Sequence, residues 1–130
     1  MTDGMAEAAR RALRFCHAPY SGFRVAAVLE DGEGCLHTGV NVENASYGLS
    51  ICAERSAVAG AVSRGATTFR RILVHSPDGR AVPCGACRQV LAEFCGDSTP
   101  VAVLLPDGGI EETTLGELIP DAFRLRPGNA

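Results

Sequence analysis

Two short segments of the chain carry side chains whose types and spacing could do chemistry. They are Cys52-Ala53-Glu54 and Pro83-Cys84-Gly85-Ala86-Cys87. A helix is expected to begin at each segment, and the free N–H groups and dipole of a helix start lower the pKa of a nearby thiol. Cys84 and Cys87 are three residues apart, so their sulfurs lie on the same side of a first helical turn. Three thiolates at two facing helix starts could therefore bind one Zn²⁺.

The number of ligands decides what such a zinc site would do. Structural zinc sites are closed by four protein ligands, whereas three cysteines leave the fourth tetrahedral position open to water. Glu54 is placed to take a proton from that water and pass it on, which predicts a catalytic site. Cys95 could be a fourth ligand in principle, but it lies about 16 Å along the helix from Cys84, so we exclude it. The remaining cysteines are expected to be buried as small hydrophobic residues: Cys16, Cys35 and Cys95.

The elements that must bring these segments together follow from the spacing of hydrophobic residues. Short apolar strands alternating with helices indicate a sheet covered on both faces, and an opening hairpin with its turn at Asp31-Gly32 makes that sheet mixed. We therefore predict an α/β fold: a three-layer α-β-α sandwich with a mixed, five-stranded sheet, and with both helix starts at the C-terminal ends of parallel strands. We expect one domain over residues 1–130, with a core from about residue 7 to 124. The expected helices cover residues 5–16, 50–65, 84–96 and 115–118, the last capped by Thr114, and the expected strands cover residues 23–29, 35–42, 72–74, 101–105 and 110–113.

The composition excludes several classes of function. The chain has 130 residues, 46% of them hydrophobic, and a formal net charge of −3. All 12 of its Lys and Arg residues are Arg. Because Schiff-base enzymes, pyridoxal phosphate enzymes and the phosphate-binding P-loop all need a Lys, these classes are excluded. A mildly acidic chain also lacks the basic surface that binds long nucleic acid, so a small neutral substrate fits better. With no apolar stretch of membrane-spanning length and no secretory signal, we expect a cytoplasmic protein that contacts neither a membrane nor long nucleic acid.

Beyond these properties, the sequence resembles the short, homotetrameric, zinc-dependent cytidine deaminases. The two cysteine segments match the signature of zinc deaminases, with Cys in the place of His. The resemblance runs in the family's order from about residue 7 to residue 124. Three further segments carry it: Ala18-Pro19-Tyr20-Ser21-Gly22-Phe23, Asn41-Val42-Glu43-Asn44-Ala45-Ser46-Tyr47-Gly48 and Leu118-Ile119-Pro120-Asp121-Ala122-Phe123.

The resemblance implies hydrolytic deamination of cytidine and 2′-deoxycytidine to uridine and 2′-deoxyuridine, a reaction of pyrimidine salvage. Cys52, Cys84 and Cys87 would hold one zinc ion per subunit, and Glu54 would be the proton shuttle for water that the zinc activates. Zinc with three thiolates carries a formal charge of −1, which weakens its pull on water relative to a site with a histidine ligand. Arg55 is the natural group to offset that charge.

Further roles come from the resemblance alone. Phe23 would flank the pyrimidine ring, and the Ala53 backbone would hydrogen-bond the base. Asn41 and Glu43 would hold the ribose hydroxyls, and Gln89 would donate to a cysteine sulfur. In the similar homotetramers, neighbouring subunits complete each pocket around the nucleoside. Three residues would therefore lie at the site of another subunit: Ala45, Tyr47 and Phe123.

Two alternative functions stay open. Blasticidin-type and modified-nucleoside aminohydrolases share the zinc motifs and the fold, although residues 41–44 and Phe23 favour a plain nucleoside. A non-catalytic, zinc-stabilised binding module would have a closed metal site and would not depend on Glu54. The chain departs from the family at Ala26, where a glycine is common, but this position touches neither the zinc ligands nor Glu54.

Overall fold

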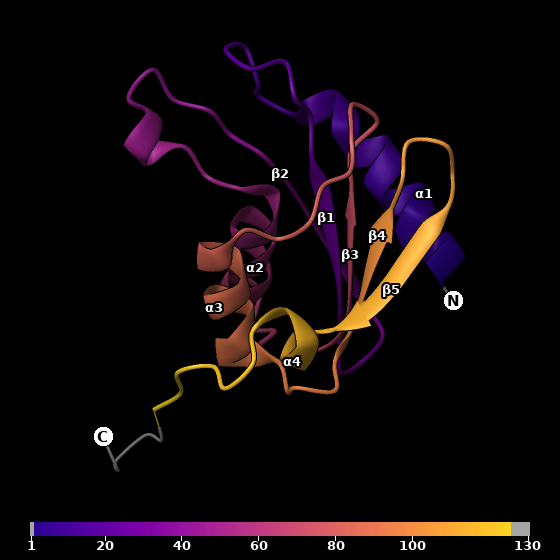
Figure 1. Cartoon of the computed structure of the whole chain (residues 1–130), viewed down its shortest axis with the longest axis vertical. Coiled ribbons are helices and arrows are strands. Elements are labelled where there is room, and N and C mark those ends of the chain that lie inside the picture. Colours follow the sequence, from indigo (N-terminus) through magenta and orange to yellow (C-terminus); the bar gives the residue numbers. More distant parts are fainter. Residues whose placement is uncertain (1, 126–130) are drawn as a thin grey trace.

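The computed structural model of the chain describes residues 2–125 and contains one five-stranded mixed sheet (Figure 1). Its strands are β1 (Ala26–Asp31), β2 (Leu36–Val40), β3 (Phe69–His75), β4 (Pro100–Leu104) and β5 (Ile110–Thr114). They lie side by side in the order β2-β1-β3-β4-β5. β1 is antiparallel to both of its neighbours, β3 and β4 are parallel, and β5 is antiparallel to β4. The predicted mixed, five-stranded sheet is confirmed.

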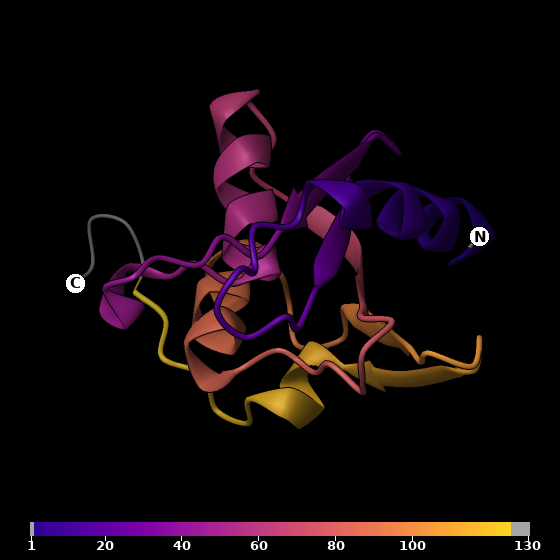
Figure 2. The same ribbon diagram turned by 90° about the horizontal axis from the view of Figure 1, so that it is seen from above.

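Helices cover both faces of this sheet (Figures 1 and 2). α1 (Thr2–Ala12) packs on one face, whereas α2 (Ala53–Ser63) and α3 (Gly85–Phe94) pack on the other. A short helix, α4 (Leu115–Leu118), follows β5 and contacts α3. The three-layer α-β-α sandwich is therefore confirmed. Over residues 2–125, no helix is long and apolar enough to cross a membrane.

The central strand β1 shows why the sheet needs two covering layers. All six of its residues are buried, and successive side chains point to opposite faces. Ala27 and Leu29 belong to the apolar cluster beneath α2 and α3, whereas Ala26 and Val28 belong to the cluster beneath α1. The continuous apolar run in the sequence thus has a helix layer on each side.

One glycine fixes where the first cysteine segment stands. α2 lies so close to β2 that a Cβ at position 39 would be 2.2 Å from the backbone nitrogen of Ala57 and 2.5 Å from the carbonyl oxygen of Ala53. Gly39 is the residue type that permits this approach. Because Cys52 immediately precedes α2, the close packing of α2 on β2 also determines how far Cys52 lies from the sheet.

The predicted element order is confirmed, but several bounds differ: the strand expected at residues 72–74 extends over Phe69–His75, and the helix expected at residues 50–65 covers Ala53–Ser63. The first helix ends at Ala12 and continues only as a short 3₁₀ turn, not as a helix to residue 16. β1 begins at Ala26 rather than Phe23, because the backbone N–H groups before it donate to side chains instead of to a strand, as that of Arg24 does to Asp78. β2 and β3, which lead to the two helix starts, do run in the same direction, but antiparallel β1 lies between them.

The three cysteines outside the metal segments have different environments. Cys95 is buried and Cys16 is partly buried, whereas Cys35 is exposed. The prediction of a buried Cys35 was wrong because this residue belongs to the β1–β2 turn, where its N–H donates to the Asp31 carboxylate. The expected cap of the last helix is confirmed, since Thr114 Oγ1 accepts a hydrogen bond from the N–H of Glu117 at 3.3 Å.

Candidate active site

The sulfur atoms of three cysteines, which come from two helix starts, lie close together. Cys52 and Cys84 are the residues that immediately precede α2 and α3, and Cys87 lies in the first turn of α3. The Sγ atoms of Cys52 and Cys84 are 3.8 Å apart, those of Cys84 and Cys87 are 3.5 Å apart, and all three lie within 4.8 Å of one another. Tetrahedral zinc with Zn–S bonds of about 2.3 Å requires sulfurs about 3.8 Å apart. Two of the three separations are close to this value, so the cluster fits a zinc ion.

The expected lowering of thiol pKa at the helix starts holds for Cys84 but not for Cys87. Burial raises the pKa of Cys87, and the nearby Glu54 carboxylate raises it further. Burial also acts on Cys84, but hydrogen bonds from the Cys87 and Ala86 backbone and from neighbouring thiols bring its pKa below the ordinary value. Three thiolates packed together without a cation would repel one another, and a divalent ion removes that cost.

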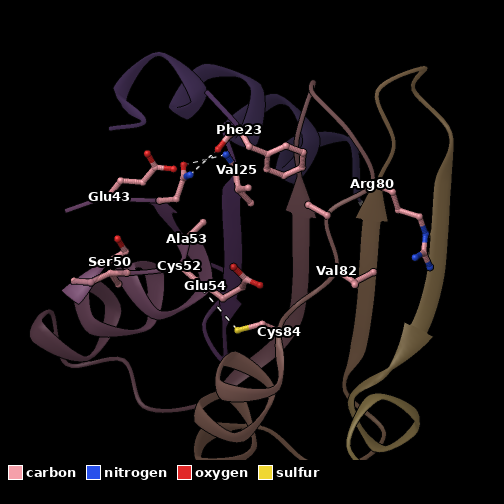
Figure 3. Close-up of a pocket in the computed structure, with 13 residues that line it drawn as sticks. Phe23, Val25, Glu43, Ser50, Cys52, Ala53, Glu54, Arg80, Val82 and Cys84 are labelled. Atoms are coloured by element: carbon pink, nitrogen blue, oxygen red, sulfur yellow. Dashed lines mark hydrogen bonds between the residues drawn. The ribbon is translucent and has the colours of Figure 1, made fainter. Parts of the chain in front are cut away.

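Glu54 lies beside this cluster, inside a cavity of about 390 Å³. The residue is only 4% exposed, and burial raises the pKa of its carboxyl group. Figure 3 shows its carboxylate in the cavity above Cys84. The same cavity is bounded by Phe23 and by Cys52. A buried acid, two of the three grouped cysteines and room for a small molecule therefore share one space, and Cys87 is buried behind it.

Comparison with known proteins decides what this combination is. The family model described as the cytidine and deoxycytidylate deaminase zinc-binding region matches residues 2–103. The chain belongs to this deaminase family. Membership confirms the predicted family, a zinc-dependent enzyme, and zinc as its cofactor.

Individual relatives extend the similarity over most of the chain. A cytidine deaminase of Sporosarcina psychrophila is 44% identical over 115 residues, which cover 88% of this chain and 85% of the relative. A probable cytidine deaminase of Dictyostelium discoideum is 46% identical over 119 residues, covering 90% and 80%. The 1.6 Å crystal structure of cytidine deaminase from Burkholderia pseudomallei superposes with a TM-score of 0.86 at 41% identity, over 95% of this chain and 99% of that chain.

Arg55 lies beside the cysteine sulfurs, where a positive charge would offset the negative charge of three thiolates. Its Nη2 is 3.8 Å from the Sγ of Cys52, and its buried Nε has no hydrogen-bond partner among the described residues. Gln89 differs from the expectation, because its Nε2 donates to the carbonyl oxygen of Phe123 at 2.8 Å, and residues 2–125 contain no bond from it to a sulfur. Gln89 follows Cys87 by two residues on α3, so the two side chains leave the helix on nearly opposite sides.

Asn41 and Glu43 line the cavity, and the side chain of each also forms hydrogen bonds with the segment that precedes β1. The Asn41 side chain accepts from the Val25 N–H at 3.0 Å and donates to the Phe23 carbonyl oxygen at 2.7 Å. The Glu43 carboxylate accepts the hydroxyl and N–H of Ser21 and the N–H of Tyr20, and the bond from Ser21 lowers the pKa of Glu43. Both side chains retain unused hydrogen-bonding capacity for a ligand.

The structure places the remaining predicted residues in two groups. Phe23 and Ala53 line the cavity. Ala45, Tyr47 and Phe123 are exposed and are not among the residues that line it, with Tyr47 73% and Phe123 68% exposed. Sequence reasoning missed several lining residues: Val25, Ser50, Ile51, Arg80, Ala81 and Val82. The only signal for residues 80–82 was their position directly before the Pro83-Cys84 segment.

Proposed function

We propose that this chain hydrolyses cytidine and 2′-deoxycytidine to uridine and 2′-deoxyuridine with release of ammonia. The observation that carries the proposal is that Glu54 lines one cavity together with Cys52 and Cys84, two of the three grouped cysteines. A cavity of about 390 Å³ is within the range of small-molecule sites, about 300–1,000 Å³. The relatives named above as cytidine deaminases support the choice of substrate.

Cys52, Cys84 and Cys87 would hold the zinc ion. The chemistry that zinc supplies when bound is Lewis-acid activation of a water molecule near neutral pH. Glu54 takes a proton from that water and delivers it to N3 of the pyrimidine while the oxygen adds to C4. Glu54 then moves the hydroxyl proton at C4 to the amino nitrogen. The C4–N bond breaks, ammonia leaves, and the ring keeps its proton at N3 as uridine.

The nucleoside would be held by other residues that line the same cavity. The Asn41 side-chain amide would donate to one ribose hydroxyl, and the Glu43 carboxylate would accept from another, through hydrogen-bonding capacity that the chain itself leaves unused. Phe23 would flank the ring, and the backbone of Ala53 would bind the base. Hydrogen-bonded recognition of this kind selects strongly against a base that lacks the sugar.

Arg55 would moderate the negative charge of a three-thiolate site. We expect Arg55→Gln to lower kcat by about tenfold and to speed the loss of zinc to a chelator, because neighbours that orient and neutralise ligands affect both properties to that extent. The measurement is steady-state turnover together with the rate of zinc transfer to a colorimetric chelator. Unchanged values of both would remove this role from Arg55.

The assembly and cellular setting belong to the same proposal. We propose a homotetramer in which Ala45, Tyr47 and Phe123 complete a neighbour's pocket, because all three are exposed in the single chain. We further propose a single-domain, cytoplasmic enzyme of pyrimidine salvage that binds neither membrane nor long nucleic acid. Light scattering tests the assembly: a mass of four chains supports it, and a monomer that retains full activity contradicts it.

A substrate panel tests the proposed function. The zinc-loaded protein is incubated with cytidine, deoxycytidine, cytosine and blasticidin S, and the ultraviolet absorbance is followed. We expect absorbance loss with both nucleosides and none with cytosine. Loss with blasticidin S alone would favour the blasticidin-type alternative, and no loss with any compound would favour the zinc-stabilised binding module.

A further inference from the structure

Two loops far apart in sequence form one wall of the cavity and are joined by an ion pair. The loop before β1 contributes Phe23 and Val25 to the lining, and the loop after β3 contributes residues 80–82. Between them, Arg24 meets Asp78 through three hydrogen bonds. Its backbone nitrogen and Nε are 2.9 and 3.1 Å from Oδ2, and its Nη2 is 2.9 Å from Oδ1. The guanidinium and the carboxylate thus meet in a bidentate pair.

Asp78 is itself fixed on the second loop. Its N–H donates to the hydroxyl of Ser76 at 3.0 Å, and Ser76 is fully buried. Hydrogen bonds from the Arg24 side chain and backbone lower the pKa of Asp78 to about 2. The carboxylate therefore stays charged, and the pair stays intact, throughout the neutral pH range.

The Phe23 ring rests against the residue that follows Asp78. A Cβ at position 79 would lie 3.0 Å from Cε1 and 3.4 Å from Cζ of Phe23, so a side chain there would require the ring to shift by a few tenths of an ångström. The backbone of Phe23 is held as well, since its carbonyl oxygen accepts from Asn41 and its N–H donates to the Ser21 hydroxyl. Figure 3 shows the ring beside the segment that carries Arg80 and Val82.

We propose that Arg24, Asp78 and Gly79 are positioning residues that hold the Phe23 ring at the place where it contacts the nucleoside. This inference rests on the proposed function. None of the three is among the residues that line the cavity, so they act through Phe23. A purely structural ion pair of this exposure would contribute little to stability and would leave substrate affinity unchanged.

Two substitutions test the proposal, one at the ion pair and one at the contact with the Phe23 ring. Asp78→Asn weakens the pair, and Gly79→Ala crowds the ring. We expect each to raise the KM for cytidine by about three- to tenfold, with kcat within about twofold, because Glu54 and the cysteines lie on other elements. Arg24→Lys should behave like Asp78→Asn, because lysine lacks the planar fork.

Arg70→Gln is the matched control. Arg70 is 55% exposed, close to the 51% of Arg24, and it also meets a carboxylate at 2.9 Å, that of Glu30. It is not among the residues that line the cavity, and we expect an unchanged KM. An equal rise in KM for Arg70→Gln would mean that the effect reflects general destabilisation, and would overturn the proposal.

A double-mutant cycle separates positioning from an independent effect. In a Phe23→Ala background, Asp78→Asn and Gly79→Ala should no longer change the KM, because the ring they hold is gone. Effects that add in full to that of Phe23→Ala, or an unchanged KM in the native background, would overturn this inference while leaving the proposed function intact. A native chain that leaves cytidine unchanged would overturn the proposed function first, and this inference with it.

Discussion

Glu54→Gln should nearly abolish deamination while leaving zinc and fold in place. Glutamine has the shape of glutamate but cannot move a proton, and general acid–base groups contribute roughly 10²- to 10⁴-fold to rate. We expect kcat for cytidine to fall by at least about 10³-fold, because Glu54 handles every proton of the reaction. Zinc per chain should stay at the native value, since Glu54 is not one of the three grouped ligands. The measurement pairs a stopped absorbance assay with metal analysis.

Glu30→Gln is the control that separates burial from chemistry. Glu30 is 5% exposed and Glu54 is 4% exposed, so the same change is made at two equally buried carboxylates. Glu30 is paired with Arg70 and Arg71 on β3, and burial, which would raise its pKa, is outweighed by these bonds, so its pKa is lowered. Glu30→Gln should therefore reduce stability and keep turnover. Glu54→Gln should keep the fold and lose turnover. Near-native turnover of Glu54→Gln would exclude Glu54 as the proton shuttle.

Cys87→Ala should remove both zinc and activity. Cys87 is the buried member of the three-sulfur group, and two remaining cysteines do not make a stable zinc site. We expect bound zinc to fall from about one per chain to near zero, and the loss of a tightly bound metal to lower the free energy of unfolding by about 3 kcal/mol or more. Metal analysis and thermal unfolding with and without a chelator measure these effects. Chelation should lower the Tm of the native protein but not that of Cys87→Ala.

Cys95→Ala provides the matched comparison, at the residue that directly follows the same helix. Cys95 is also buried and lies at the far end of α3 from Cys87. It should retain zinc and turnover, with only the modest loss of stability expected when a small buried group is removed. Loss of zinc in Cys95→Ala, or full zinc in Cys87→Ala, would contradict the assignment of the three ligands.

The sequence revealed one pair of the metal cluster because that pair is local. Cys84 and Cys87 are three residues apart at one helix start, so spacing alone places their sulfurs on one side. Cys52 lies 32 residues before Cys84 and joins them only because the fold brings a second helix start alongside. The sheet was predictable for a similar reason, since apolar runs such as β1 require cover on both faces.

Other parts of the site depend on contacts that no local pattern encodes. Arg24 pairs with Asp78 across 54 residues of sequence, and this contact is one reason why β1 starts at Ala26 rather than Phe23. Gln89 points to the Phe123 carbonyl because of where the C-terminal segment crosses α3, which the helical spacing does not determine. Such partners become visible only when the loops are packed in three dimensions.

The central claim is that zinc held by three cysteines, with Glu54 beside it, deaminates cytidine. The most direct test is product balance: zinc-loaded protein is given cytidine, and uridine and ammonia are quantified together. We expect equal amounts of uridine and ammonia, formed catalytically and only while zinc is bound. Protein that carries one zinc per chain and forms neither product would contradict it.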